Sequence, residues 1–213
     1  MVDALEVTVT AAVASFRDPL YSAVQKCLPC PPPATIGGML AAAAGGWEHV
    51  DPETRFAAAF TAAATGTDVE TWHPVSGTGR RLDPQPRDRD FLADVELTIW
   101  FTEDIDIWQQ RLRRPVHGLS LGRSQDLVGI GCRAVDLDET TDIPVGHTIL
   151  PTEEVGNVRL PQAINLDRDR TQWGSFWYFP AGGERLIPRC LATEDGRAVV
   201  ALPPTHPRHA EES

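Results

Sequence analysis

The sequence predicts an α+β protein, and three observations support this fold class. Apolar and polar side chains alternate along residues 4–13 and 91–102, which is typical of strands with one buried face. Capping and stop signals delimit helices between the strand-like segments. Beyond residue 137 the chain consists of short apolar runs separated by turn residues, a pattern that predicts a β-rich C-terminal part.

Two helices are expected after the first strand. The first spans residues 36–44, with Thr35 as its N-cap and a glycine pair after its last residue. The second is expected to begin at Asp51, because an aspartate followed by proline and glutamate is a common helix start. It has phenylalanines on one face and is predicted to end near Gly66.

Residues 67–137 complete a known order of elements. Their sequence predicts a strand at 67–75, a loop-like stretch at 76–90, the strand at 91–102, a helix that begins after Asp104 and ends at Pro115, and a strand at 127–137. With the doubled helix counted once, the order is strand, helix, strand, strand, helix, strand. This is the ferredoxin-like βαββαβ arrangement, which predicts a four-stranded antiparallel sheet with the helices on one face.

We therefore expect three parts: a ferredoxin-like core at 1–137, a β-rich part at 138–202 and a flexible tail at 203–213. The β-rich part is predicted to hold strands at 147–150, 158–164, 173–179, 186–193 and 198–202, the last two joined by a hairpin turn at 194–197. A ferredoxin-like core does not by itself assign a function, although its open sheet face is one common platform for RNA.

Composition limits the class of protein. A chain of 213 residues, 42% hydrophobic and 23% charged, can bury a sizeable core, which excludes wholesale disorder. The longest nearly apolar run, residues 36–47, is too short to span a bilayer, and the N-terminus lacks the basic start and apolar block of a signal peptide. We expect a cytoplasmic protein with no membrane partner.

Charge is unevenly distributed along the chain. The formal net charge of −11 argues against binding nucleic acid by bulk charge alone. However, residues 19–47 and 107–123 contain no acid, whereas acids concentrate at 136–142. The second acid-free window holds Arg111, Arg113, Arg114 and Arg123. A locally basic surface on an acidic protein is therefore compatible with the sequence.

Cys27 and Cys30 have the C-x-x-C spacing of metal and redox motifs. A structural zinc site needs four ligands, but Cys132 and Cys190 are isolated and no histidine pair has finger spacing. A redox motif opens a helix after a strand, whereas three prolines follow this pair. The two readings are a metal or redox module and plain thiols in a loop.

Residues 31–40 (Pro-Pro-Pro-Ala-Thr-Ile-Gly-Gly-Met-Leu) lead a rigid proline run into a helix start that is glycine-rich and free of acids. Unpaired N–H groups at such a start favour an anion, and Gly37 and Gly38 let a phosphate come close to the backbone. Tight packing of the helix on the sheet is the alternative reason for the two glycines.

Residues 118–128 (Gly-Leu-Ser-Leu-Gly-Arg-Ser-Gln-Asp-Leu-Val) join the later helix to its strand. Gly122 suits a turn, and Arg123 and Ser124 can donate hydrogen bonds to phosphate. The alternative is a turn in which Arg123 pairs with Asp126.

In this order and on this fold, four motifs together resemble a known family. They are Ala-Ser-Phe-Arg-Asp-Pro at 14–19, the glycine-rich stretch at 32–40 with Ala43 and Gly45, Arg-Asp-Phe-Leu at 89–92, and Leu-Gly-Arg-Ser-Gln-Asp-Leu-Val at 121–128. The chain resembles the CRISPR-associated RAMP family numbered five among the Cas proteins, from about residue 6 to residue 130. The first two motifs look more like the type I-A and I-B versions than the type I-E version.

The resemblance implies a non-catalytic subunit that caps the 5′ handle of the crRNA in the Cascade complex and contacts the large subunit and the backbone subunits. It implies no cofactor and a thumb hairpin at 71–90, with target DNA as a further partner near the thumb. The residues expected to bind RNA are Arg17, Thr35, Gly37, Gly38, Met39, Arg123 and Ser124 for the handle, and Arg80 and Arg81 on the thumb.

Two alternatives come from other functional classes. In subtype I-C the family member is a metal-independent endoribonuclease that cuts the repeat RNA, and His117, in the acid-free window, is the best candidate here for proton transfer. The second alternative is the metal or redox module built on Cys27 and Cys30.

Overall fold

The computed structural model describes residues 1–18, 21, 25–73, 77, 79, 81 and 83–211. Its elements are β1 (Val2–Ala14), α1 (Pro33–Ala44), a 3₁₀ turn (Trp47–His49), β2 (Ala57–Trp72), β3 (Gln85–Phe101), α2 (Ile105–Arg113), β4 (Gly129–Thr140), β5 (Ile143–Gly146), β6 (Leu150–Thr152), β7 (Val158–Ile164), β8 (Thr171–Trp177), β9 (Gly183–Ile187), β10 (Cys190–Ala192), β11 (Ala198–Val199) and α3 (Arg208–Glu211). The described part is mostly β structure with few helices, rather than an even mixture.

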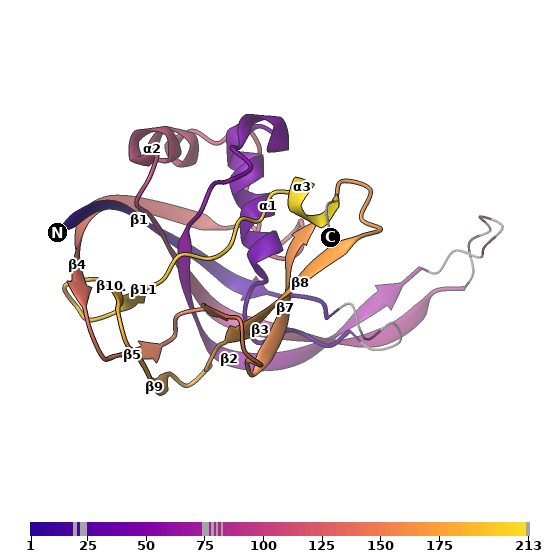
Figure 1. The fold of residues 1–213 in the computed structure, drawn as a ribbon. Coiled ribbons are helices and arrows are strands. Elements are labelled where there is room, and N and C mark those ends of the chain that lie inside the picture. Colours follow the sequence, from indigo (N-terminus) through magenta and orange to yellow (C-terminus); the bar gives the residue numbers. More distant parts are fainter. Residues whose placement is uncertain are drawn as a thin grey trace.

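The main sheet has six strands in the order β11-β10-β4-β1-β3-β2, and every neighbouring pair is antiparallel. The central strand β1 places Val7 opposite Ile99 of β3 on one side and Cys132 of β4 on the other. α1 follows β1 and α2 follows β3, and both helices cover the same face of the sheet (Figure 1).

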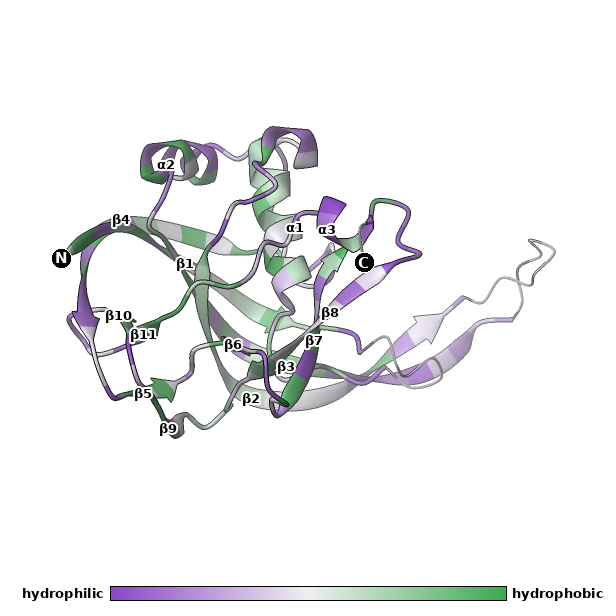
Figure 2. Cartoon of the chain, in the orientation of Figure 1, coloured by the Kyte–Doolittle hydropathy of each residue, from purple (hydrophilic) through white to green (hydrophobic). Residues whose placement is uncertain are grey.

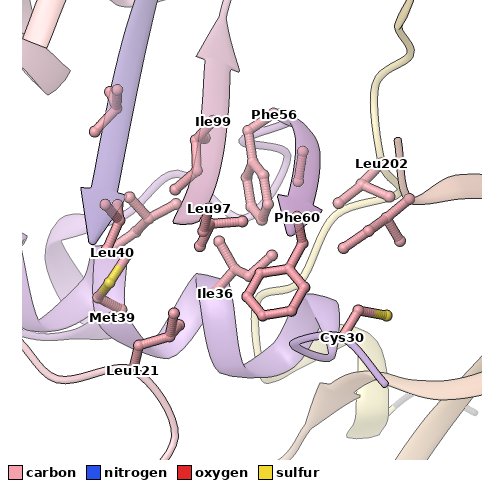
Figure 3. Packing of buried hydrophobic residues seen from close by; sticks show 14 of the residues in the cluster. Cys30, Ile36, Met39, Leu40, Phe56, Phe60, Leu97, Ile99, Leu121 and Leu202 are labelled. Carbon is pink, nitrogen blue, oxygen red and sulfur yellow. The ribbon is translucent and has the colours of Figure 1, made fainter. Parts of the chain in front are cut away.

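The main core lies between these helices and the sheet. Ile36 and Leu40 of α1 pack toward Leu97 and Ile99 of β3, as Figure 3 shows. Trp108 of α2 belongs to the same buried cluster. Apolar residues at every second position of the strands and at helical spacing on α1 produce this face.

The opposite face of the sheet holds a buried carboxylate. Glu6 is 3% exposed and accepts hydrogen bonds from Trp100 Nε1 at 2.9 Å, Arg133 Nε at 2.7 Å and Arg197 Nη2 at 2.7 Å. Trp100 and Arg133 are its direct neighbours across β3 and β4. The ion pairs therefore offset the cost of burying this charge.

The start of α1 differs from the prediction. The helix begins at Pro33, its N-cap is Pro32 and not Thr35, and no side chain caps it. Pro32 O accepts from the amides of Thr35 at 2.9 Å and Ile36 at 3.2 Å. The fixed φ of proline suits a first helical residue, so the proline run starts the helix earlier than the threonine signal indicated. The predicted end is confirmed, because Gly45 is left-handed with φ 97°.

The helix predicted from Asp51 to Gly66 is wrong. Asp51 begins only a turn, in which its Oδ1 accepts from the Glu53 amide at 2.8 Å. The chain then forms β2, with Ala58 on the helix-covered face and Ala59 on the other, and both are buried. Because both faces of this strand are covered, small side chains fit there, and tertiary packing overrides the helix propensity of alanine.

β2 and β3 continue beyond the body as a two-stranded arm, paired as far as Trp72 opposite Gln85. Figure 1 shows this arm projecting from the body, and Figure 2 shows that it is mostly polar. Residues 85–90, predicted as loop-like, belong to β3. Arg89, 7% exposed, forms ion pairs with Asp68 and with Glu70.

The C-terminal part forms a three-stranded sheet in the order β6-β8-β7 and the pair β5-β9. It covers the outer edge of β2: the amide of Phe60 donates to His147 O at 3.1 Å, the amide of Ile149 to Ala58 O at 2.9 Å, and the amide of Leu202 to Phe56 O at 2.8 Å. The strand predicted at 158–164 is β7, whereas the one predicted at 186–193 divides into β9 and β10.

Residues 203–211 pack on the body, where the sequence predicts a free tail. Thr205 is 5% exposed and lies against α1, and His206 Nε2 lies 3.2 Å from Trp47 O. Short α3 ends this segment. Among the residues that the structure describes, no helix is long and apolar enough to cross a membrane.

Candidate nucleic-acid interface

A groove of about 700 Å³ runs along one side of α1, from Ala34 to Ala42. We call it the α1 groove. Five segments line it: one side of α1, the 3₁₀ turn at Trp47, the loop at 118–122, β7 with the turn that leads into β8, and the C-terminal segment at 205–207. Its lining residues are Ala34, Thr35, Gly38, Met39, Ala42, Trp47, Gly118, Ser120, Gly122, Pro161, Ile164, Asn165, Leu166, Arg168, Thr171, Thr205 and Pro207.

Small residues form one row on the α1 side of the groove. Ala34, Gly38 and Ala42 follow one another at four-residue spacing, so they lie one above the other on the helix. Thr35 and Met39 also line the groove, although Met39 is only 4% exposed. The first turn of α1 contains no acid, so its positive dipole end is not neutralised.

Gly37 and Gly38 have different surroundings. A Cβ atom at Gly37 would lie 2.2 Å from Thr205 Oγ1 and 3.1 Å from the Trp47 ring, so the residue is a packing glycine beneath the C-terminal segment. A Cβ atom at Gly38 would meet nothing within 4 Å. No contact within the described part of the chain requires glycine at position 38, and this glycine exposes bare helix backbone to the groove.

The loop at 118–122 is held close to the end of β1. Gly122 has φ 95°, and a Cβ atom there would lie 2.6 Å from Ser15 O. Next to it, Arg123 donates from Nε and Nη2 to both carboxylate oxygens of Asp126, at 2.8 and 2.9 Å. The pairing that the sequence offered as the alternative is therefore present, and it neutralises much of the charge of Arg123.

The other predicted RNA-binding residues lie outside the groove lining. Arg17 and Ser124 are exposed, and so is Arg81 near the tip of the arm. Arg80 falls outside the described residues. His117 is exposed, and its amide donates to Ala42 O at 3.3 Å, so it lies beside α1 and next to Gly118 of the groove.

The electrostatic character of the groove contrasts with that of the whole chain. None of the described residues lining it is an aspartate or glutamate, and its one charged side chain is Arg168. By comparison, a hollow of about 880 Å³ at the N-terminus of β1 is lined by five acids, Glu6, Asp136, Asp138, Glu194 and Asp195, against one arginine, Arg133. An anion is therefore accommodated far better in the α1 groove.

Sequence reasoning missed the groove residues Trp47, Asn165, Leu166 and Arg168. Asn165 to Arg168 follow a strand, and alternating acids and arginines at 167–170 have the composition of an ordinary solvated turn. No local signal distinguishes this turn, because only the packing of β7 against α1 brings it to the groove.

The cysteines have the properties of structural thiols. Burial raises the pKa of Cys30 well above its ordinary value of 9.0, and burial likewise raises the pKa of Cys27. Neither thiol is therefore poised as a thiolate at neutral pH. In the described part of the chain, no three histidine, cysteine, aspartate or glutamate side chains gather to hold a metal ion.

Comparisons with known proteins bear on this fold and groove. A family model described as CRISPR-associated protein (Cas_Cas5) matches residues 4–173. One chain of a solved CRISPR RNA-guided surveillance complex is 18% identical, with a TM-score of 0.57 over 84% of this chain and 90% of that one. A chain of the type III-B Cmr-beta complex, solved with cognate target RNA and AMPPnP, is 8% identical, with a TM-score of 0.52 over 84% of this chain and 85% of that one.

At these identities the two structures show a shared fold. No curated protein sequence matches the chain. The family model covers most of the 213 residues and confirms the family that the four motifs indicated. The chain belongs to the Cas5 family of CRISPR-associated proteins, and its fold matches subunits of CRISPR RNA-guided complexes.

Proposed function

We propose that this protein is a non-catalytic subunit of a type I Cascade complex and that it caps the 5′ handle of the crRNA in the α1 groove. The observation that carries the proposal is the groove itself: an acid-free hollow on a protein of net charge −11, with bare helix backbone on one side. Membership of the Cas5 family supports an RNA ligand rather than another anion.

The chemistry of the groove suits a single-stranded RNA backbone. The Thr35 hydroxyl can donate to a phosphate oxygen at the positive end of α1, and the absence of a side chain at Gly38 leaves room for the sugar-phosphate chain. The apolar lining, including the half-buried Trp47, offers a surface on which an unstacked base can pack, whereas Met39 is buried.

We infer the finer features from the same fold. The order β4-β1-β3-β2, with α1 after β1 and α2 after β3, supports a ferredoxin-like RAMP core. The arm occupies the position of the thumb, near the first spacer nucleotides and target DNA. Because Arg89 is already paired within the arm, exposed Arg81 is the better candidate for such contacts. The motifs at 14–19 and 32–40 favour subtypes I-A and I-B. The family resemblance implies the large and backbone subunits as partners.

The absence of catalysis is part of the proposal. None of the described residues lining the groove is histidine, lysine or tyrosine, the usual groups for metal-free RNA cleavage. Lys26 pairs with Asp90 at 3.2 Å, and the hydroxyl of Tyr178 is buried and donates to Phe60 O at 3.0 Å. Cleavage of repeat RNA that persists in chelator and is lost in His117→Ala would establish the endoribonuclease instead.

The test is to co-express the tagged chain with the genes that flank it and to sequence the RNA that co-purifies. We expect a uniform population whose 5′ ends share one short repeat-derived handle, together with the large and backbone subunits. A chain that is purified alone and free of RNA, from a locus in which the other subunits are well expressed, would refute the capping role.

A further inference from the structure

The turn between β7 and β8, residues 165–170, is an element of the α1 groove that lies outside all four sequence motifs. β7 packs against α1, and α3 packs against both β7 and β8. The turn therefore stands at the rim of the groove, on the same side of the molecule as α3 (Figure 1). It comes from the C-terminal part of the chain, whereas every other charged or polar group considered for RNA comes from the first 124 residues.

Asn165 fixes the shape of this turn. The residue is 7% exposed, and its Oδ1 accepts from the amides of Asp169 at 3.1 Å and Arg170 at 3.0 Å. Its Nδ2 donates to Asp169 Oδ1 at 2.6 Å, and its carbonyl accepts from the Arg168 amide at 3.0 Å. Because a buried side chain holds both ends of the turn, the backbone of Arg168 has one defined position.

Arg168 is the unpaired cation of the groove. Within the part of the chain that the structure describes, no hydrogen bond or ion pair joins its guanidinium to another residue, whereas Arg123 is held by both oxygens of Asp126. Its neighbour on the turn, Arg170, donates to Glu211 O at 3.4 Å and does not line the groove. Leu166 lines the groove and is 68% exposed, which gives the turn an apolar contact surface.

We propose that the β7–β8 turn binds the RNA together with α1, with Arg168 contacting a handle phosphate and Leu166 packing against a base. Asn165 is the positioning residue for both contacts. This inference rests on the proposed function, because it assigns a further contact surface to the same groove. It assigns the cationic contact with phosphate to Arg168 in place of Arg123, which does not line the groove. The β-rich part of the chain then takes part directly in RNA binding.

The experiment uses the complex co-expressed from the flanking genes, with the full chain. Ultraviolet crosslinking of the bound RNA, followed by tryptic digestion, reports which peptides touch it, and the peptide at 160–168 contains Leu166. In parallel, the affinity for RNA is followed by its loss during a KCl titration for wild type, Arg168→Ala and the matched control Arg170→Ala, which removes the same charge from the same turn.

We expect a crosslink in peptide 160–168 and an affinity about tenfold lower in Arg168→Ala, with Arg170→Ala like wild type. The salt dependence of binding should also become shallower in Arg168→Ala, because one phosphate contact is lost. If the complex holds the handle but Arg168→Ala matches either wild type or Arg170→Ala, this inference is wrong and the capping role stands. A complex that holds no handle RNA overturns both.

Discussion

Replacing Gly38 with glutamine distinguishes a glycine that RNA binding requires from one that packing requires. Glycine inside a helix costs roughly 0.5–1 kcal/mol relative to a good helix former. Among the residues that the structure describes, none lies close enough to position 38 to require a glycine there and so offset this cost. Gly38→Gln should therefore stabilise the folded chain by about that amount. For a chain of this length, the melting temperature should rise by about 1–4 °C.

The same substitution should impair RNA binding. A glutamine side chain at position 38 occupies the part of the groove where the handle backbone is proposed to lie. We expect RNA retention in the co-expressed complex to fall at least about tenfold, because the side chain excludes a close backbone contact. The combination of higher stability and weaker RNA binding is what a functional glycine predicts.

Gly37→Ala is the matched control on the next residue. Its Cβ atom would lie 2.2 Å from Thr205 Oγ1 and 2.9 Å from Thr205 Cβ, so the C-terminal segment must move. Overpacking of this kind costs about 1–3 kcal/mol, more than the gain in helix propensity. We expect thermal unfolding at a lower temperature than wild type. A Gly38→Gln protein that melts early, or that keeps its RNA to the same salt concentration as wild type, would refute the reasoning.

Four further predictions follow from single contacts. Glu6→Gln should lower the free energy of unfolding by about 2 kcal/mol in urea denaturation, because the charge that pairs with two arginines is lost; an unchanged midpoint would contradict this. Tyr178→Phe should cost about 1–2 kcal/mol in the same assay, since Phe60 O loses its buried donor. The raised pKa of Cys30 favours the neutral thiol in the folded state, so its contribution to stability is present at neutral pH and is lost as pH rises above the ordinary value of 9.0. In a chain whose other three cysteines are replaced by serine, Cys30 should accordingly react with Ellman's reagent at pH 7.5 only after denaturant is added, and rapid native labelling would be inconsistent with this. Asn165→Ala should leave the chain folded, as judged by circular dichroism, but should lower RNA retention as Arg168→Ala does. Retention equal to that of wild type would show that RNA binding does not need the side-chain hydrogen bonds of Asn165.

Much of the fold could be predicted from local patterns. The alternation in residues 4–13 and 91–102 identified β1 and β3, and the order of the first elements agrees with the prediction once the second helix is removed. That helix was wrong because the signal at Asp51 is local and is equally served by a turn. Whether an alanine-rich segment becomes helix or strand depends on what covers both of its faces, and local sequence does not contain that information.

The candidate site was partly predictable for a related reason. The glycine-rich start of α1 and the loop at 118–122 both line the α1 groove, and the loop is close to Ser15 after β1, where a Cβ atom at Gly122 would meet the Ser15 carbonyl. Which glycine faces solvent depends on Thr205, far away in sequence. Arg168 lies 130 positions after Gly38, and only the docking of the C-terminal sheet on α1 relates the two.

The covering of the β2 edge has a consequence for synthesis of the chain. The groups that pair with Phe56, Ala58 and Phe60 belong to residues 147–149 and 202. At about 5–20 residues per second, a ribosome needs on the order of ten seconds to make the intervening chain. During that interval the N-terminal half presents a bare strand edge beside an incomplete core, which is the surface that chaperones bind and on which nascent chains aggregate. Fusions or truncations that end near residue 140 would make this exposure permanent, so a soluble chain requires the C-terminal part.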